Sequence, residues 1–438
     1  MSGPAEKKRD LGLIELVAIS LGGMIGGGIF SILGVAVEQV GNAAPVAIAA
    51  GAGLALLAAW SYARLAAYYE DEGATYSFFK RTFPGSRAAA AAIGWLVVFG
   101  YISTLALYAF TFASYLGSLF PEAPVQLLRG GLGGAVLATF AVLNIVSVKW
   151  MGRVEDVFVY TKLLALVVVT GVLYFSGSAS SAQPVCDSQF DLSSIWVVAA
   201  LTFVAFEGFQ LSIHAYSEVN NPRRNVPRAI YISITIAALV YVLLAEGALW
   251  ALDKQQIIAD REFALAAGAA AVLGPMGHAL MLGAALLATS SAISGTLFGA
   301  ARLMAVIADD GYLPATFSRR VRGHVPARAI IVMAALAWIL VLTGGLDLIL
   351  EFGSLTFMLV SLLMAVANLK IREHTGANLW VGLLAVAALV SGVLLIISWQ
   401  LRTDLSHFIV TLGVGVAVVV GSMIYARRHP QPLKPSSS

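Results

Sequence analysis

The sequence predicts an all-α, polytopic membrane protein with twelve transmembrane helices, and three observations support that prediction. Of its 438 residues, 59% are hydrophobic and only 12% are charged, whereas about 25% of the residues in a soluble domain are charged. Apolar runs of about 20 residues, long enough to cross a bilayer, recur along almost the whole chain. The segments between these runs are alternately rich and poor in lysine and arginine, as they are in membrane proteins.

The predicted spans follow one another closely from residue 11 to residue 426. The first and the eighth are long enough to include a kink or an interfacial portion. In chain order, the twelve spans are residues 11–40, 43–63, 88–117, 127–148, 154–176, 193–216, 229–252, 272–306, 326–344, 346–369, 379–399 and 407–426.

The placement of lysine and arginine predicts that both termini lie in the cytoplasm. With the N-terminus inside, 22 of the 27 basic residues fall in inside segments and 4 in outside segments, and Lys162 lies within the fifth span. This is the bias of the positive-inside rule. The net charge of +3 follows from it, so the expected environment is a lipid bilayer and no nucleic-acid partner is expected. The alanine-rich composition and the lone cysteine favour the inner membrane of a prokaryotic cell.

An extended polar loop, residues 177–192, divides the predicted spans into two blocks. The first repeat, residues 11–176, holds spans one to five, and the second repeat, residues 193–371, holds spans six to ten. Because each block has an odd number of spans, the two blocks lie inverted relative to each other in the membrane. The remaining segments are the last two spans, 372–426, and two cytoplasmic tails, 1–10 and 427–438.

Five glycines within residues 22–28 interrupt the first span at mid-depth. Each glycine costs about 1 kcal/mol of helix propensity relative to alanine, so a continuous helix is unfavourable here. Broken helices at membrane depth are tolerated where the freed backbone lines a cavity, and in secondary transporters that cavity holds the substrate. A simpler alternative is helix packing, since the segment contains two GxxxG patterns. The sixth span, which mirrors the first in an inverted repeat, places Glu207 beside Gly208 and favours the binding-site interpretation.

Four motifs occur in a fixed order and at matching membrane depths. They are Gly23–Phe30 in the first span, Phe206–Phe209 in the sixth, Glu218–Ile230 after the sixth and Ala301–Pro314 after the eighth. Over residues 10–425 the chain thereby resembles the amino acid permeases of the amino acid–polyamine–organocation (APC) superfamily, and among them the prokaryotic proton-coupled transporters. The resemblance implies the leucine transporter fold, a five-plus-five inverted repeat with discontinuous helices one and six, and alternating access about these two helices.

The two breaks are expected to offer a ligand opposite charges. Free N–H groups at the start of the outer half of the first helix suit a carboxylate, and the candidates are Ile25, Gly26, Gly27 and Gly28. By resemblance to the family, an ammonium group would be held at the sixth-span break by the carbonyls of Phe203, Val204, Ala205, Phe206 and Glu207. A zwitterion matches two half-helix ends of opposite sign, which favours α-amino acids over sugars or nucleobases.

Aromatic residues at the sixth-span break have two interpretations. Phe203 or Phe206 could close over the ligand as a lid, with Val204 as the alternative occupant of the lid position, or both rings could pack in the core. The carboxylate of Glu207 is a separate case, because an ionisable side chain at mid-membrane is expensive and is functional by default. Glu207 could contact a cationic substrate, carry a proton, or tie the broken helix to a neighbour.

Lys162 lies about eight residues from the cytoplasmic end of its span, too deep for easy snorkelling. Burial disfavours the charged form of an amine and carbonyl partners favour it, so such a group can gain and lose a proton. The resemblance implies that its ammonium takes the place of sodium, with the Gly22 carbonyl and Ser290 or Ser291 as partners. The prediction is proton coupling without sodium, and the alternative is a lysine of fixed charge that holds the inner bundle together.

The leading prediction is therefore an importer of amino acids by proton symport, with the proton as coupling ion and no cofactor. The alternative is a sodium- and proton-independent exchanger of amino acids or polyamines. A transporter-like sensor or a membrane enzyme is less favoured, because the sequence shows no appended soluble domain, catalytic motif or metal-ligand spacing. No disulfide-linked heavy chain is expected, since the loop at residues 120–124 lacks a cysteine and Cys186 lies elsewhere.

Overall fold

The computed structural model describes residues 11–120, 122, 124–146, 148–176, 192–260, 263–320 and 325–429. Within these ranges the regular structure is helical, apart from one isolated backbone bridge between Leu11 and Val219. The polar loop at 177–191 with Cys186, the tail at 1–10 and the end of the chain from residue 430 lie outside the described residues.

The helices follow the predicted apolar segments closely. In chain order, the α-helices are α1 (Leu13–Met24), α2 (Gly27–Val40), α3 (Ala44–Tyr69), α4 (Ala74–Thr82), α5 (Arg87–Gly117), α6 (Val125–Val146), α7 (Val148–Ser176), α8 (Leu192–Leu201), α9 (Leu211–His214), α10 (Pro222–Ala251), α11 (Lys254–Asp260), α12 (Ala264–Leu273), α13 (Pro275–Asp309), α14 (Ala327–Thr343), α15 (Leu346–Lys370), α16 (Arg372–Thr375), α17 (Leu379–Thr403) and α18 (Leu405–Arg428). The short helices α4, α11, α12 and α16 lie between predicted spans and were not anticipated.

In the described part of the chain, 10 helical segments are long and apolar enough to cross a membrane. One of them, Gly27–Tyr69, runs through parts of the first two predicted spans, and two predicted spans contain the shorter apolar helices Leu13–Met24 and Ala327–Thr343. The structure thus confirms an all-helical membrane protein, while the count of twelve spans and the inverted repeat stay predictions.

Proline and glycine mark several helix boundaries. Pro45, Pro222 and Pro275 lie in the first turn of α3, α10 and α13, where a missing N–H leaves no helical hydrogen bond unmade. Gly376 adopts φ of +63° just after α16, the left-handed conformation that commonly ends a helix. The prolines explain where α3, α10 and α13 begin, and Gly376 explains where α16 ends. Local sequence alone is enough for these boundaries.

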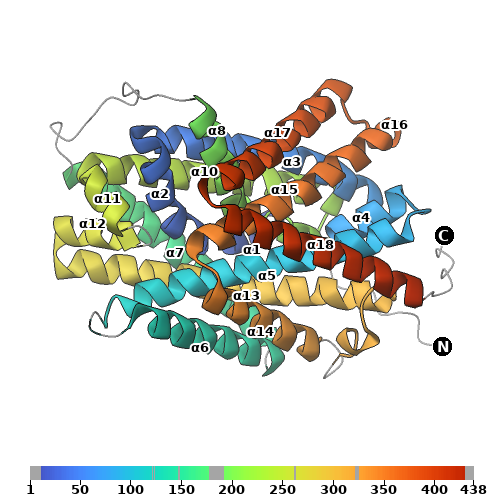
Figure 1. The fold of residues 1–438 in the computed structure, drawn as a ribbon, viewed down its shortest axis with the longest axis horizontal. Helices are drawn as coiled ribbons and strands as arrows, with labels where there is room; N and C mark the ends of the chain where they lie inside the picture. Colours follow the sequence, from blue (N-terminus) through green and yellow to red (C-terminus); the bar gives the residue numbers. More distant parts are fainter. Residues whose placement is uncertain are drawn as a thin grey trace.

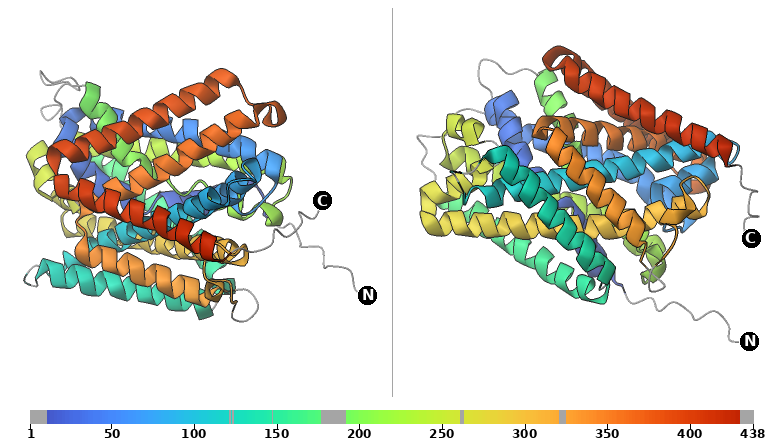
Figure 2. Two further views of the ribbon diagram at one scale, coloured as in Figure 1. Left: turned by 45° about the vertical axis from the view of Figure 1, so that its right-hand side comes forward. Right: turned by 60° about the horizontal axis from the view of Figure 1, so that its bottom comes forward.

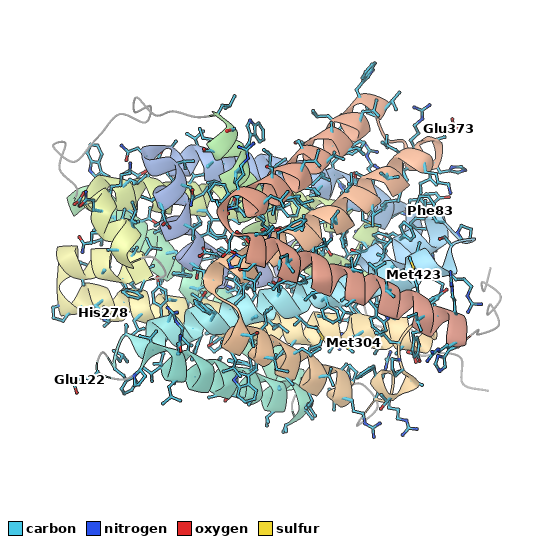
Figure 3. The ribbon with its side chains drawn as sticks, viewed as in Figure 1. Phe83, Glu122, His278, Met304, Glu373 and Met423 are labelled. Atoms are coloured by element: carbon cyan, nitrogen blue, oxygen red, sulfur yellow. The ribbon has the colours of Figure 1, made fainter. Side chains whose placement is uncertain are left out.

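The short helices lie at the two ends of the bundle. Figure 1 shows α4 and α16 at one end and α11 and α12 at the opposite end. Figure 3 places Glu122 and His278 at the same end as α11 and α12, and Phe83 and Glu373 at the other. Among the described segments, α4 and α16 from two predicted inside segments thus lie at one end, and α11 and α12 from a predicted outside segment lie at the other.

The helices divide into a buried centre and an apolar periphery. Helices α5 and α13 carry long runs of buried residues, and α6 and α14 lie side by side along one face (Figures 1 and 2). Large apolar side chains on the outer helices are widely exposed, as in Leu127 (74%), Leu164 (65%) and Leu394 (60%). Because extensive exposed apolar surface is rare in soluble proteins, this periphery suits contact with lipid.

Candidate functional site

The first break separates α1 from α2 at Ile25 and Gly26. The Ile25 N–H donates to the Leu21 carbonyl and the Gly26 N–H donates to the Met24 carbonyl, both at 2.9 Å. The first N–H groups of α2 have no partner within their own helix. Of the four residues that the sequence proposes for a carboxylate, Gly27 and Gly28 therefore supply the available donors, whereas Ile25 and Gly26 use theirs inside the chain.

The sixth-span break begins where α8 ends at Leu201 and continues as a 3₁₀ turn over Thr202–Phe206. Ser354 on α15 stabilises this change of direction, because its Oγ donates to the Leu201 carbonyl at 2.6 Å and accepts from the Val204 N–H at 3.2 Å. The Glu207 N–H then donates to the Val204 carbonyl at 3.1 Å. Ser354 is a positioning residue that sequence reasoning missed.

The two breaks touch each other backbone to backbone. Gly208 adopts φ of +132°, and a Cβ placed on it would lie 2.7 Å from the Gly23 carbonyl carbon and the Met24 nitrogen. A Cβ placed on Gly28 would lie 2.9 Å from the Cβ of Ala205. Glycine at these positions lets the two unwound segments approach closely, because an added Cβ would overlap the facing segment.

Replacing Gly208 with alanine should destabilise the protein by about 2–4 kcal/mol, because the new Cβ meets backbone and the residue keeps a conformation that L-residues rarely adopt. Thermal unfolding of the purified protein in detergent measures this loss. The matched control is Gly171→Ala on α7, where a Cβ meets nothing within 4 Å and helix propensity improves. Equal unfolding temperatures for the two variants would show that the breaks are not packed as described.

Two buried tyrosines hold the breaks in place. The Tyr241 hydroxyl on α10 lies 2.7 Å from the Met24 carbonyl and 3.2 Å from the Ala205 carbonyl. The Tyr108 hydroxyl on α5 donates to the Gly23 carbonyl at 2.6 Å. A buried tyrosine usually finds a partner for its hydroxyl, and here the partners are carbonyls that the breaks release from their helices. Sequence reasoning missed both residues, although a tyrosine in mid-span is a recognisable signal.

The three lid candidates are all buried in this structure. Phe203, Val204 and Phe206 are at most 1% exposed, and the Phe206 ring packs at 5.4 Å from the ring of Tyr241. In this structure Phe206 packs between α10 and the break, which is compatible with either interpretation. A lid function for Phe203, Phe206 or Val204 stays a prediction.

Lys162 reaches from α7 to the first break. Its fully buried ammonium donates to the carbonyls of Gly22 at 2.9 Å and Ile25 at 2.7 Å, and lies 3.5 Å from the hydroxyl of Ser291 on α13. Of the two candidate serines, Ser291 is the one that Lys162 contacts, and the Ile25 carbonyl is a partner that the sequence did not indicate. One ammonium thus joins α7, α13 and the end of α1.

Glu207 directly follows the 3₁₀ turn of the sixth-span break. Its side chain is 1% exposed, and in the described structure neither carboxylate oxygen has a hydrogen-bond partner. The neighbouring Gln210 accepts from Tyr101 at 3.3 Å and from Thr75 at 3.2 Å, while its Nε2 is also without a partner. The described contacts give no support to Glu207 as a structural tie and leave its carboxylate as a buried acceptor at the sixth-span break.

Comparisons with known proteins agree with this architecture. The sequence model of the amino acid permease family matches residues 11–426. The inner membrane transport protein YbaT of Escherichia coli is 29% identical over 380 residues, which cover 85% of this chain and 86% of that protein. The human Asc-type amino acid transporter 1 is 28% identical over 359 residues, covering 79% and 68%.

A solved structure shows the same fold at low sequence identity. The crystal structure of the Eremococcus coleocola manganese transporter, in complex with an aromatic bis-isothiourea substituted compound, superposes with a TM-score of 0.64 at 15% identity, over 95% of this chain and 94% of that one. The similarity extends over nearly the whole chain, like the match of the family model. The protein is thus a membrane transporter that belongs to the amino acid permease family.

Proposed function

We propose that the protein imports amino acids across the cell membrane by proton symport, with alternating access about its two broken helices. The observation that supports this most directly is the position of Lys162. Its ammonium binds the carbonyls of Gly22 and Ile25, and the free N–H groups of Gly27 and Gly28 begin only two residues further along the chain. A proton on the lysine and a carboxylate on the N–H groups would therefore act on the same short backbone segment.

A change in the charge of Lys162 would change how firmly α1 is held. A hydrogen bond from a charged donor is roughly twice as strong as a neutral one, so the loss of one proton weakens every contact of the ammonium together. The end of α1 would then be freer to move against α7 and α13. Loading the proton from the outside and releasing it to the cytoplasm couples that movement to the proton gradient.

The proposed substrate is a zwitterionic amino acid. Its carboxylate would lie on the N–H groups at the start of α2, where the helix dipole is positive. Its ammonium would lie at the carbonyls of the sixth-span break, residues 203–207. Glu207 adds an unpaired carboxylate at the same break, and a buried charge without a partner is costly, so an incoming ammonium group, or a proton, satisfies it.

The orientation in the membrane is part of the same proposal. The bias of lysine and arginine toward one set of loops and the gathering of α4 and α16 at one end of the bundle support twelve spans with both termini in the cytoplasm. In a prokaryotic cell this places the protein in the inner membrane.

An exchanger that needs neither sodium nor protons is the second candidate. The short contacts of Lys162 favour it, because two carbonyls at 2.7–2.9 Å stabilise a permanent positive charge. In that case the lysine would hold the bundle together and never release its proton. Substrate on the inner side would then be required for any uptake.

Uptake of a panel of labelled amino acids into proteoliposomes tests the proposal. With sodium absent throughout, we expect an inward proton gradient to drive accumulation above the outside concentration, and an uncoupler to abolish it. Uptake that requires internal amino acid and ignores the gradient would support the exchanger. A requirement for sodium at constant pH would contradict both.

A further inference from the structure

A cavity of about 250 Å³ lies beside the outer halves of the two broken helices. Helices α2, α8 and α15 line it, together with the turn between α17 and α18. Leu201 and Thr202, at the sixth-span break, are part of the lining. The titratable side chains in the lining are Asp347, Glu351, Asp404 and His407.

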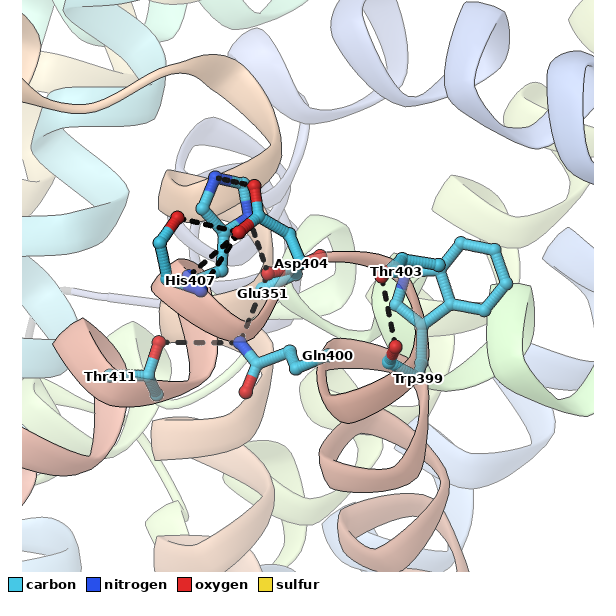
Figure 4. Close-up of polar contacts among 8 residues, drawn as sticks. Glu351, Trp399, Gln400, Thr403, Asp404, His407 and Thr411 are labelled. Carbon is cyan, nitrogen blue, oxygen red and sulfur yellow. Dashed lines mark hydrogen bonds and ion pairs between the residues drawn. The ribbon is translucent and has the colours of Figure 1, made fainter.

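His407 lies between two of these carboxylates (Figure 4). Its Nδ1 is 3.1 Å from Oε2 of Glu351, and its Nε2 is 3.6 Å from Oδ2 of Asp404. A neutral imidazole carries one N–H, whereas an imidazolium carries two. Only the protonated ring can therefore direct an N–H toward each carboxylate, as a hydrogen bond to Glu351 and an ion pair with Asp404, and the neutral ring must leave one nitrogen lone pair facing a negative charge.

Glu351 connects this cluster to the core. It is 5% exposed, and its Oε2 also accepts from the Nε2 of Gln400 on α17 at 3.0 Å. One turn further along α15, Ser354 binds the end of α8 and the Val204 N–H. The position of α15 relative to the turn between α17 and α18 therefore affects the sixth-span break, because Ser354 on α15 binds that break.

The other charged groups near the ring come from α15, α2 and α17. Asp347 lies one turn before Glu351 on the same helix, and the lining residues of α2 and α8 carry no titratable side chain. Glu38 on α2 and Arg402 at the end of α17 are exposed and outside the lining. The hydroxyl and N–H of Ser406 lower the pKa of the Asp404 carboxyl, which favours its ionised form.

We propose that His407, Glu351 and Asp404 form a latch on the outer face that closes when His407 takes up a proton from outside the cell. The closed latch clamps α15 to the turn between α17 and α18 and narrows the cavity beside α8. Loss of that proton removes the ionic attraction between the ring and Glu351 and leaves at most a neutral hydrogen bond there, so α15 is held less firmly and the cavity widens. The outward position of the turn rests on the orientation proposed above, but the latch itself needs neither substrate nor a proton gradient.

Accessibility of a cysteine in the cavity tests the latch. Val35 on α2 lines the cavity, and replacing the lone Cys186 with serine leaves Val35→Cys as the reporter. The rate of modification by an uncharged maleimide is measured without substrate at about pH 5 and about pH 8, on either side of the ordinary histidine pKa. Each rate is divided by that of the same reporter with His407→Gln, which cancels the ordinary pH dependence of the thiol.

We expect the normalised rate to fall at least about fivefold on acidification, the lower end of ordinary coupling between two sites. Glu351→Gln should remove that dependence, and His278→Gln, at the same end of the bundle but outside the cavity, should preserve it. A normalised rate that is equal at both pH values would overturn the proposal, as would full pH dependence in Glu351→Gln. Because the assay contains no substrate, failure of proton symport would not alter its outcome.

Discussion

Replacing Lys162 with alanine is expected to abolish proton-driven accumulation while exchange of amino acids persists. A hydrogen bond to a charged group contributes about 1.5–3 kcal/mol, so removing the contacts to Gly22 and Ile25 should lower net uptake by at least about tenfold. Exchange requires no net movement of protons and survives if the breaks still bind substrate. Parallel measurements of gradient-driven uptake and of exchange in proteoliposomes separate the two activities.

Lys162→Arg distinguishes a cycling proton from a fixed charge. The guanidinium of arginine does not lose its proton in proteins, yet it can donate to the same carbonyls. If Lys162 carries the coupled proton, this variant should fold and fail to accumulate substrate. Full accumulation by Lys162→Arg would show that a permanent charge suffices and that the proton travels elsewhere.

Replacing Glu207 with glutamine is expected to stop or strongly reduce transport without loss of stability. Both carboxylate oxygens are buried and unpaired in the described structure, and an unsatisfied buried group costs about 1–3 kcal/mol, more when it is charged. The neutral variant should therefore unfold at the same temperature as the wild type or above it. Thermal unfolding without substrate, together with the uptake assay, measures both effects.

The matched control for this variant is Glu246→Gln. Glu246 is an exposed carboxylate on α10 whose Oε2 accepts from the Tyr174 hydroxyl at 2.7 Å, so its loss should leave transport unchanged. A large drop in the unfolding temperature of Glu207→Gln, with transport retained by the folded fraction, would identify Glu207 as a structural tie after all.

Local composition was enough to predict the two breaks and the lysine. Five glycines within 22–28 disfavour a helix wherever the segment packs, and a charge such as Lys162 or Glu207 in an apolar span stands out without any knowledge of its neighbours. The helix boundary at Ile25 follows from these glycines. Predictions of this kind need only the physics of one helix in a bilayer.

The partners of these groups could not be predicted in the same way. Serines and tyrosines occur in many spans, and only the packed structure shows that Ser354, Tyr108 and Tyr241 meet carbonyls released by the breaks. Likewise, the contact of Glu351 with His407 joins residues 56 positions apart. Such pairings depend on which face of each helix is turned inward, which the near-uniform apolarity of the spans does not reveal.

Proton movement during uptake tests the central proposal most directly. Proteoliposomes that contain a trapped pH indicator, with no initial gradient and no sodium, would receive the amino acid that the panel identifies. We predict that substrate addition acidifies the lumen in the wild type and that Lys162→Ala gives no such change. Uptake of labelled substrate by the wild type with no change of internal pH would contradict proton symport and leave the exchanger as the function.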